Sequence, residues 1–389
     1  AAGAVLGSKM GWEPANVFAP PGTPAILDYS WEAPTWLPWC RAEQAATRHT
    51  VGVFDQTSFA KYLVTGPDAS ATLQWLCTAD VDVPVGRAVY TGMLNSAGGY
   101  EADVTVTRCG PQEFLVVSGA ASAVRDVDWI RRKTPEGHRT EVVDITAMYA
   151  VFGVMGPASR ALLARLSGAD LSDAAFPFST SRELRLGYAT VRATRITYVG
   201  ELGWELYVPV EFAAGVYDDL LEAGSDLGVV PAGYYTIDAM RLEKGYRAFG
   251  RELVPDATPV EAGLTFTCKL GSEVDFLGRA AVERVKAAGP SRRIVSVVAG
   301  DPAAYLWGGE LLLRDGAPVG QVTSAGWGHA LGAPVGLAWV SDRHTGRVTA
   351  DWLRSGTYEV DLAGQRVPVT VSLRPPLDPD GTRLGRGAA

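Results

Sequence analysis

Residues 86–108, which are Gly86-Arg87 followed by AVYTGMLNSAGGYEADVTVTR, are the part of the sequence that most clearly indicates a fold. Apolar and polar residues alternate along the first third, a turn follows at residues 95–99, and the alternation resumes as ADVTVTR. Alternation with a period of two on both sides of a glycine turn is typical of a β-hairpin. Because residues 112–118 have the same character, the sequence predicts a β-meander over 86–117.

Helical and strand-like patterns alternate along the chain on both sides of this meander. A strand, a helix, the meander and another helix are followed by a second series in a similar order. This order predicts an internally duplicated α+β body, although no residue-level repeat is visible. The predicted helices cover 41–49, 67–77, 122–133, 157–166, 211–228 and 234–248, and the further strands cover 60–64, 188–198 and 203–210.

The composition changes at both ends of this body. Residues 1–40 are rich in tryptophan and proline, so we expect an ordered arm that wraps the body, which covers 41–290. From residue 292 short strands alternate with glycine turns, as in a small β-barrel, here placed at 291–374. Residues 375–389, PPLDPDGTRLGRGAA, are expected to form a mobile tail.

The composition excludes several classes of protein. The 389 residues suggest two or three domains, and 47% apolar with 20% charged residues is an ordinary globular mixture. A formal charge of −8 without a basic cluster argues against nucleic acid or an anionic membrane as partner. No apolar run approaches the ~20 residues of a membrane span, and the first residues do not resemble a secretory signal.

Cysteine, histidine and glycine motifs point to no metal or nucleotide site. The cysteines and the histidines are dispersed, so we expect reduced thiols, a cytoplasmic protein and no metal. Residues 326–332, GWGHALG, precede a strand rather than the helix that a dinucleotide loop requires. The chain contains no GxxxxGK[ST], HExxH or GxSxG motif.

Carboxylates stand in three well-defined sequence frames. Asp103 begins a strand directly after the glycine turn, where Asp is unfavourable unless it caps the turn or has a function. Glu201 and Glu205 lie in TYVGELGWELYVP (197–209), and Arg241 begins Arg-Leu-Glu near a helix end. Taken singly, these residues also fit a turn cap, an edge-strand glutamate facing water and a solvated helical face.

Taken together, these frames resemble the aminomethyltransferase family, namely the glycine-cleavage T-protein and the folate-binding C-terminal half of dimethylglycine and sarcosine dehydrogenases and oxidases. The resemblance covers nearly the whole chain. It implies a three-domain ring with a duplicated α+β body, a C-terminal β-barrel and tetrahydrofolate in a central channel. The segments that carry it are VGVFDQTSFAKYLVTGPDA (51–69), 86–108, 197–209, MRLEKGYRAFGRELVPDATPVEAGL (240–264), VGQVTSAGWGHALG (319–332) and PPLDPDGTR (375–383).

The resemblance also implies roles for particular residues. Asp103 matches the family's catalytic aspartate, expected to orient the folate and to stabilise positive charge on the one-carbon unit. The other matching positions are expected to bind the cofactor, and a carboxylate is a suitable bidentate acceptor for adjacent N–H groups of a pterin. These cofactor-binding candidates are Tyr90, Tyr198, Glu205, Glu201 and Arg241.

Three departures favour the flavin-dehydrogenase branch of this family. Ile237 stands where the T-protein has an arginine, Ser118-Gly119 stands where it has Asn-Ala, and PPLDPDGTR (375–383) stands where it ends near an aromatic pair. The opening GSKMGWEPANVFAP (7–20) is similar to the junction at which the bifunctional proteins begin their folate half. The chain also lacks an initiator Met. The absence of the T-protein arginine argues against an aminomethyl group carried on a lipoyl protein.

The sequence therefore predicts a tetrahydrofolate-dependent one-carbon transferase. It would accept a methylene unit from an oxidised small methylated amine, such as a glycine derivative, and yield 5,10-methylenetetrahydrofolate. A flavin-dependent oxidase would be a separate partner or a missing N-terminal half. The alternatives are a demethylase that gives 5-methyltetrahydrofolate, a glycine-cleavage T-protein, and a folate-binding accessory protein of iron–sulfur assembly. The last has a KGCYxGQE segment, whereas residues 244–250 here contain no cysteine.

Overall fold

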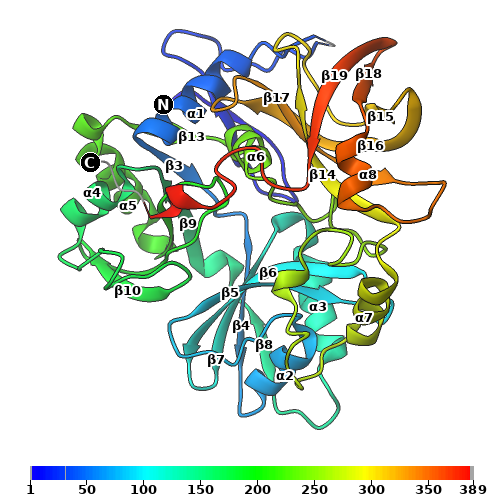
Figure 1. Cartoon of the computed structure of the whole chain (residues 1–389). Helices are drawn as coiled ribbons and strands as arrows, with labels where there is room; N and C mark the ends of the chain where they lie inside the picture. The colour runs from blue at the N-terminus through cyan, green and yellow to red at the C-terminus, as the bar shows by residue number, and fades with distance from the viewer. Residues whose placement is uncertain (1, 31, 386–389) are drawn as a thin grey trace.

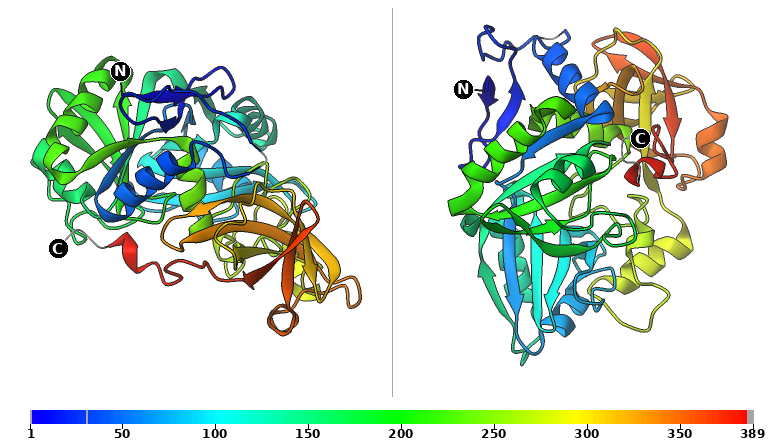
Figure 2. Two further views of the ribbon diagram at one scale, coloured as in Figure 1. Left: turned by 90° about the horizontal axis from the view of Figure 1, so that it is seen from above. Right: turned by 90° about the vertical axis from the view of Figure 1, so that its left-hand side faces the viewer.

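The computed structural model describes residues 2–30 and 32–385. Two α+β units and a β-barrel surround a common centre (Figure 1), and an N-terminal arm lies along one side (Figure 2). This arrangement confirms the predicted α+β class with a duplicated body and a C-terminal barrel. No helix among the described residues is long and apolar enough to cross a membrane.

The first unit is built on the predicted meander. Its sheet has the order β5-β6-β7-β4-β8, and β8 is a strand that the sequence patterns did not indicate. Two helices cover the apolar face of this sheet. The elements are β4 (Ala60–Thr65), α2 (Ala69–Leu76), β5 (Ala88–Leu94), β6 (Tyr100–Gly110), β7 (Glu113–Ser118), α3 (Ala123–Lys133) and β8 (Glu141–Asp144).

The second unit repeats the element order of the first. Its sheet has the order β10-β11-β12-β9-β3-β13, which is the order of the first sheet with one strand, β3, inserted. The inserted strand pairs in parallel with β13. The elements are β3 (Val51–Asp55), β9 (Tyr149–Met155), α4 (Ser159–Leu166), β10 (Ser181–Leu186), β11 (Ala189–Thr194), β12 (Gly203–Pro209), α5 (Ala213–Ala223) and β13 (Val229–Ala232).

A residue-level trace of the duplication lies where each unit's first strand turns into its first helix. Gly66-Pro67 follows β4 and Gly156-Pro157 follows β9, and the two glycines have φ of 121° and 131°. An ideal Cβ would lie 2.2 Å from a carbonyl oxygen at Gly66 and 2.4 Å from one at Gly156. Only glycine fits both positions, which corrects the view that no residue-level repeat exists.

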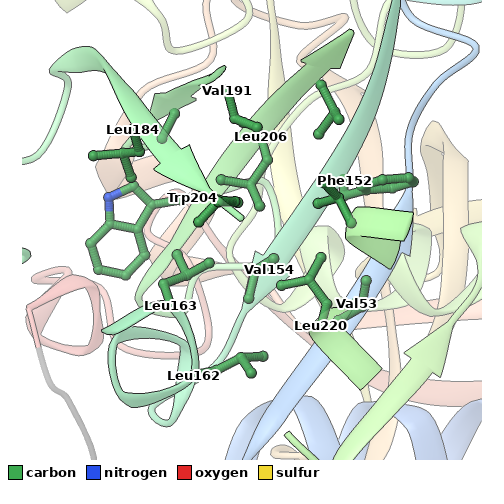
Figure 3. Close-up of a cluster of buried hydrophobic side chains, with 14 of the residues drawn as sticks. Val53, Phe152, Val154, Leu162, Leu163, Leu184, Val191, Trp204, Leu206 and Leu220 are labelled. Atoms are coloured by element: carbon green, nitrogen blue, oxygen red, sulfur yellow. The ribbon is translucent and has the colours of Figure 1, made fainter. Parts of the chain in front are cut away.

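The core of the second unit fixes which way β12 presents its side chains. Trp204 and Leu206 point into the cluster between the sheet and helices α4 and α5 (Figure 3). Successive strand residues face opposite sides, so Glu205 and Tyr207 point to the other face, toward the first unit. Both faces of β12 are covered, and for this reason Glu205 is only 6% exposed.

The C-terminal part is a closed barrel of six strands in the order β14-β17-β16-β15-β18-β19. Its interior is filled by aliphatic side chains. The strands are β14 (Arg292–Ala299), β15 (Leu311–Arg314), β16 (Ala317–Gly328), β17 (Ala333–Ser341), β18 (Tyr358–Leu362) and β19 (Gln365–Ser372), with α7 (Arg279–Ala288) before them and α8 (Ala350–Ser355) between β17 and β18.

The arm is ordered and tied to the body. It consists of the hairpin β1 (Ala4–Leu6) and β2 (Ala15–Phe18) and leads into α1 (Leu37–His49), which begins at Leu37 rather than at residue 41. The Glu43 carboxylate accepts hydrogen bonds from the backbone N–H of Phe18 (2.7 Å) and of Gly233 (2.9 Å). Burial raises the pKa of Glu43 to about 7. One buried carboxylate thus joins the arm, α1 and the start of α6.

Helix α6 (Tyr234–Glu243) lies near the centre of the molecule (Figure 1). Its first turn contacts the arm, since Asn16 Nδ2 donates to the Tyr235 hydroxyl at 3.3 Å. Ile237 packs in a cluster with residues of the second unit, and Leu242 packs against the barrel. The helix is therefore shared by the arm, the second unit and the barrel.

Residues 375–385 pack on the body rather than forming a mobile tail. Lys244 Nζ lies 3.1 Å from Asp378 Oδ2, and Arg383 Nε lies 2.7 Å from Glu201 Oε1. The remaining residues of the expected tail, 386–389, lie outside the described part of the chain.

Candidate active site

Asp103 lies on β6 directly opposite Gly92 on β5. Tyr90 also lies on β5, two residues before Gly92, so its side chain is on the same face of the sheet as Asp103. An ideal Cβ at Gly92 would lie 2.5 Å from the ring of Tyr100, so this glycine makes room for that ring. The Oδ1 atom of Asp103 is buried and makes no hydrogen bond within the described residues.

The surroundings of Asp103 favour its neutral form more than water does. Burial raises its pKa to about 7, a hydrogen bond from Tyr90 acts in the opposite direction, and the charge of Asp126 raises it further. A carboxyl group with a pKa near neutrality can both accept and donate a proton at physiological pH. A perturbed pKa in a partly buried position is typical of a functional residue.

Two tyrosines approach Asp103, one from each α+β unit. Tyr90 comes from β5, and Tyr198 comes from the segment before β12. Burial raises the pKa of both, and the charge of Asp103 contributes to both shifts. Tyr90 keeps 41% of its surface accessible, so its side chain is open to contact with a ligand. Tyr198 is held by a 2.7 Å hydrogen bond to the carbonyl of Arg247 and stacks on Tyr246.

Glu205 is buried on the inner face of β12, between Thr194 and Gly153 of the neighbouring strands. Its Oε2 atom accepts a 2.9 Å hydrogen bond from the Tyr207 hydroxyl. Burial raises its pKa to about 7, and the hydrogen bond offsets part of that shift. Its charge acts on Tyr234 at the start of α6. The second carboxylate oxygen makes no hydrogen bond to any described residue.

Arg241 is fully buried at the end of α6. Its Nε atom donates to Asp238 at 2.9 Å and its Nη1 atom donates to Glu252 at 3.0 Å. Its Nη2 atom is buried and has no hydrogen-bond partner among the described residues. The charge of Arg241 lowers the pKa of Tyr198, so the guanidinium lies within electrostatic reach of that tyrosine.

Glu201 belongs to a different cluster. Its carboxylate binds Arg48 Nη1 at 2.9 Å and Arg383 Nε at 2.7 Å, and it is 3% exposed. Arg48 also binds Glu243 at 2.5 Å. The structure therefore brings Asp103 together with the two tyrosines and Arg241, and Glu205 lies on the inner face of β12. Glu201 instead lies in an ion cluster between the second unit and residues 375–385.

Three further side chains join the site although no motif marked them. The Tyr100 hydroxyl is buried without a partner among the described residues, and Tyr100 contributes to the raised pKa of Tyr90. The guanidinium of Arg247 lies near Tyr90 and Tyr100. The ring of Tyr234 lies near Glu205. Gly92 in the middle of a strand was the one signal for Tyr100, because such a glycine often marks a close approach. Within the part of the chain that the structure describes, no group of three or more metal-ligating side chains is present.

Comparisons with known proteins agree with this architecture. Residues 1–272 match the GCVT N-terminal domain, and residues 292–378 match the glycine cleavage T-protein C-terminal barrel domain. The chain is 40% identical to 4-methylaminobutanoate oxidase (formaldehyde-forming) of Paenarthrobacter nicotinovorans, over 98% of this chain and 45% of that protein. It is 35% identical to mitochondrial sarcosine dehydrogenase of Homo sapiens, over 98% of this chain and 46% of that protein.

The chain thus spans about half the length of these curated relatives. The solved structure of glycine cleavage system aminomethyltransferase T from Bartonella henselae matches with a TM-score of 0.81, over 100% of this chain and 96% of that one. At 24% identity this likeness shows the fold. With both family domains matched in order along the sequence, the chain belongs to the aminomethyltransferase (glycine-cleavage T-protein) family.

Proposed function

We propose that this chain binds tetrahydrofolate between its two α+β units and transfers a one-carbon unit to it. The observation that carries the proposal is the meeting of Asp103, with a free buried oxygen, and two tyrosines from different units. When bound, tetrahydrofolate supplies the nitrogens that receive the one-carbon unit.

The unpaired polar atoms of the site fit a folate. A pterin ring carries adjacent N–H donors and a carbonyl acceptor, which need partners when the ring is buried. Glu205 offers a free carboxylate oxygen, Arg241 a free donor, and Asp103 a free oxygen. Tyr90 and Tyr198 supply apolar ring faces with polar tips. Glu205 and Arg241 would hold the ring in one orientation, and Asp103 would face the reacting edge.

Asp103 is the catalytic residue in this proposal. In its ionised form it stabilises positive charge that develops on the one-carbon unit. In a pocket where its pKa is about 7, it also accepts the proton released as the nitrogens are alkylated. Tyr90 orients the carboxylate through its hydroxyl. Glu205 binds and orients and takes no part in the bond changes.

We further propose that the donor is a small methylated amine and that the product is 5,10-methylenetetrahydrofolate. The relatives named for 4-methylaminobutanoate and sarcosine support this class of donor. A flavin-dependent oxidase would supply the oxidised amine. The four cysteines are free thiols, which supports a reducing compartment such as the cytoplasm.

The test combines binding, product analysis and one substitution. The protein is incubated with tetrahydrofolate and sarcosine or formaldehyde, with and without a flavin oxidase, and the folate product is identified. Asp103→Asn is expected to bind folate within about twofold of the original but to lose a factor of roughly 10²–10⁴ in turnover. The control is Asp219→Asn, an exposed aspartate on α5.

Each outcome has a defined meaning. Unchanged turnover in Asp103→Asn would contradict the catalytic role. A 5-methyltetrahydrofolate product would identify a demethylase instead. The absence of folate binding under all conditions would contradict the proposed function itself.

A further inference from the structure

The hairpin of the N-terminal arm places one lysine beside the site. Lys9 and Trp12 are joined by two backbone hydrogen bonds, of 2.8 Å from Lys9 N and 3.0 Å from Trp12 N. The two residues between them, Met10 and Gly11, have φ of 52° and 86°. Two consecutive positive φ values define a type I′ turn, which is the tightest connection for a hairpin. The side chains of Lys9 and Trp12 therefore leave the same face in a fixed direction.

That direction leads to the first residue of α6. Lys9 Nζ lies 4.5 Å from the centre of the Tyr234 ring, and the Tyr234 hydroxyl is held by Ser58 at 2.8 Å. The charge of Glu205 reaches the same tyrosine. The hairpin is thus connected through a single ring to the carboxylate that we propose binds the pterin.

Lys9 differs from the other lysines with little exposure. Lys61, Lys244 and Lys269 all direct their ammonium groups at carbonyl or carboxylate oxygens. Lys9 makes no ion pair and no side-chain hydrogen bond to any described residue, and its one recorded contact is the tyrosine ring. Its ammonium therefore keeps three donors that no described residue uses.

Two charged side chains act on Lys9. Asp238 on α6 attracts it, although the Oδ1 atom of Asp238 already accepts a hydrogen bond from Arg241 Nε at 2.9 Å. Arg251 adds a second positive charge near Lys9. Burial lowers the pKa of Lys9, Asp238 opposes that shift, and Arg251 adds to it. The local surplus is positive, which suits an anionic ligand.

The same turn also lines a surface pocket. Met10 and Trp12 form one side of a pocket of about 520 Å³, and residues 120–128 at the start of α3 form the other side, with Arg125 among them. Lys9 itself does not line this pocket, but Met10 and Trp12 of the same turn do.

We propose that Lys9 binds a carboxylate of a molecule held in the site. This inference rests on the proposed function, which supplies two sources of that group: the glutamate of the folate and the carboxylate of the methylated amino acid. Lys9 acts as a binding residue, and Arg251 raises the positive potential beside it. The type I′ turn fixes the backbone that carries Lys9, so less ordering is needed when the ligand binds.

The experiment compares ligands with and without the carboxylate. Binding of 5-formyltetrahydrofolate and of glutamate-free 5-formyltetrahydropteroate is measured by calorimetry for the original protein, Lys9→Met and Lys9→Arg. The same proteins, with folate bound, are titrated with sarcosine and with dimethylamine. Lys286→Met, an exposed lysine on α7, is the matched control. Thermal unfolding shows whether each variant is folded, and Lys9→Gln replaces Lys9→Met if that variant does not fold.

Lys9→Met is expected to weaken binding of the carboxylate-bearing ligand by roughly 10- to 100-fold, with Lys9→Arg close to the original. A loss confined to the formylfolate assigns Lys9 to the glutamate, and a loss confined to sarcosine assigns it to the donor. Unchanged binding of both, or equal losses for the ligands without a carboxylate, would overturn the proposal. If the original protein binds no folate, the proposed function fails instead, and titration of the folate-free proteins with sarcosine and with dimethylamine decides the role of Lys9.

Discussion

Replacing the proposed catalytic carboxylate should make the ligand-free protein more stable. Asp103 has a pKa of about 7 in the folded chain against an ordinary value of 3.8, chiefly because it is buried. At about 1.4 kcal/mol for each tenfold change in ionisation, this difference corresponds to at most about 4 kcal/mol. Because Asp103 retains some contact with solvent, we expect a gain of about 2 kcal/mol for Asp103→Asn above pH 7.

The sign of the pH dependence follows from the two pKa values. Between about pH 4 and pH 7 the unfolded chain has released the proton of Asp103 while the folded chain still holds it. The free energy of unfolding of the original protein therefore falls as pH rises through this range. Asparagine never ionises, so the advantage of Asp103→Asn should be near zero at pH 4 and reach its full size above pH 7.

Urea unfolding at pH 4, 5.5, 7 and 8 measures this difference directly, since the midpoint and slope give the free energy at each pH. The exposed Asp219→Asn serves as the control and should follow the original protein at every pH. A stabilisation that is the same at pH 4 and pH 8 would show that the effect does not come from ionisation. A variant less stable than the original at pH 8 would refute the reasoning altogether.

Three other substitutions test the supports of the site. Glu43→Gln turns one of the two carboxylate oxygens that accept from Phe18 N–H and Gly233 N–H into a donor, and should cost about 1–3 kcal/mol in urea unfolding. An unchanged midpoint would contradict the role of Glu43 in joining the arm to the body. Gly92→Ala places a methyl group 2.5 Å from the Tyr100 ring and should lower the free energy of unfolding by about 1–3 kcal/mol. It should also weaken folate binding measured by fluorescence. Folate binding equal to that of the original protein would show that the ring is free to move. Arg48→Met leaves the buried Glu201 and Glu243 without their shared cation. The free energy of unfolding should fall by about 3–5 kcal/mol at pH 7.5 but by less at pH 5. Equal losses at both pH values would rule out an ionic origin.

The elements that depend on neighbouring residues could be predicted from the sequence. The meander and the barrel strands follow from alternation and turn glycines, which act locally. Two helices were predicted too long at 211–228 and 234–248. They end at Ala223 and Glu243, because Gly224 and the left-handed Gly245 follow. Strands β3 and β13 were not predicted, since their parallel pairing joins segments about 180 residues apart.

In the candidate site, too, the residues that are neighbours along the chain could be predicted together, whereas contacts between distant segments could not. Asp103 and Tyr90 lie on one hairpin, so a local pattern could place them together. Glu201 and Glu205 stand in one sequence frame, yet only the latter lies beside the site. The partners of Glu201 are Arg48 and Arg383, 153 and 182 positions away, and no local pattern reports such contacts.

The position of α6 has a consequence for how ligands enter and leave. Because α6 packs against both the second unit and the barrel, neither of these two parts can move outward without losing its own contacts with the helix. We therefore expect the body to stay closed during turnover, with exchange governed by the small hairpin that carries Lys9. Opening of a short hairpin is a fast local fluctuation rather than a domain motion. Amide hydrogen exchange in residues 4–18 should then be faster than in α6, and a bound folate should slow it.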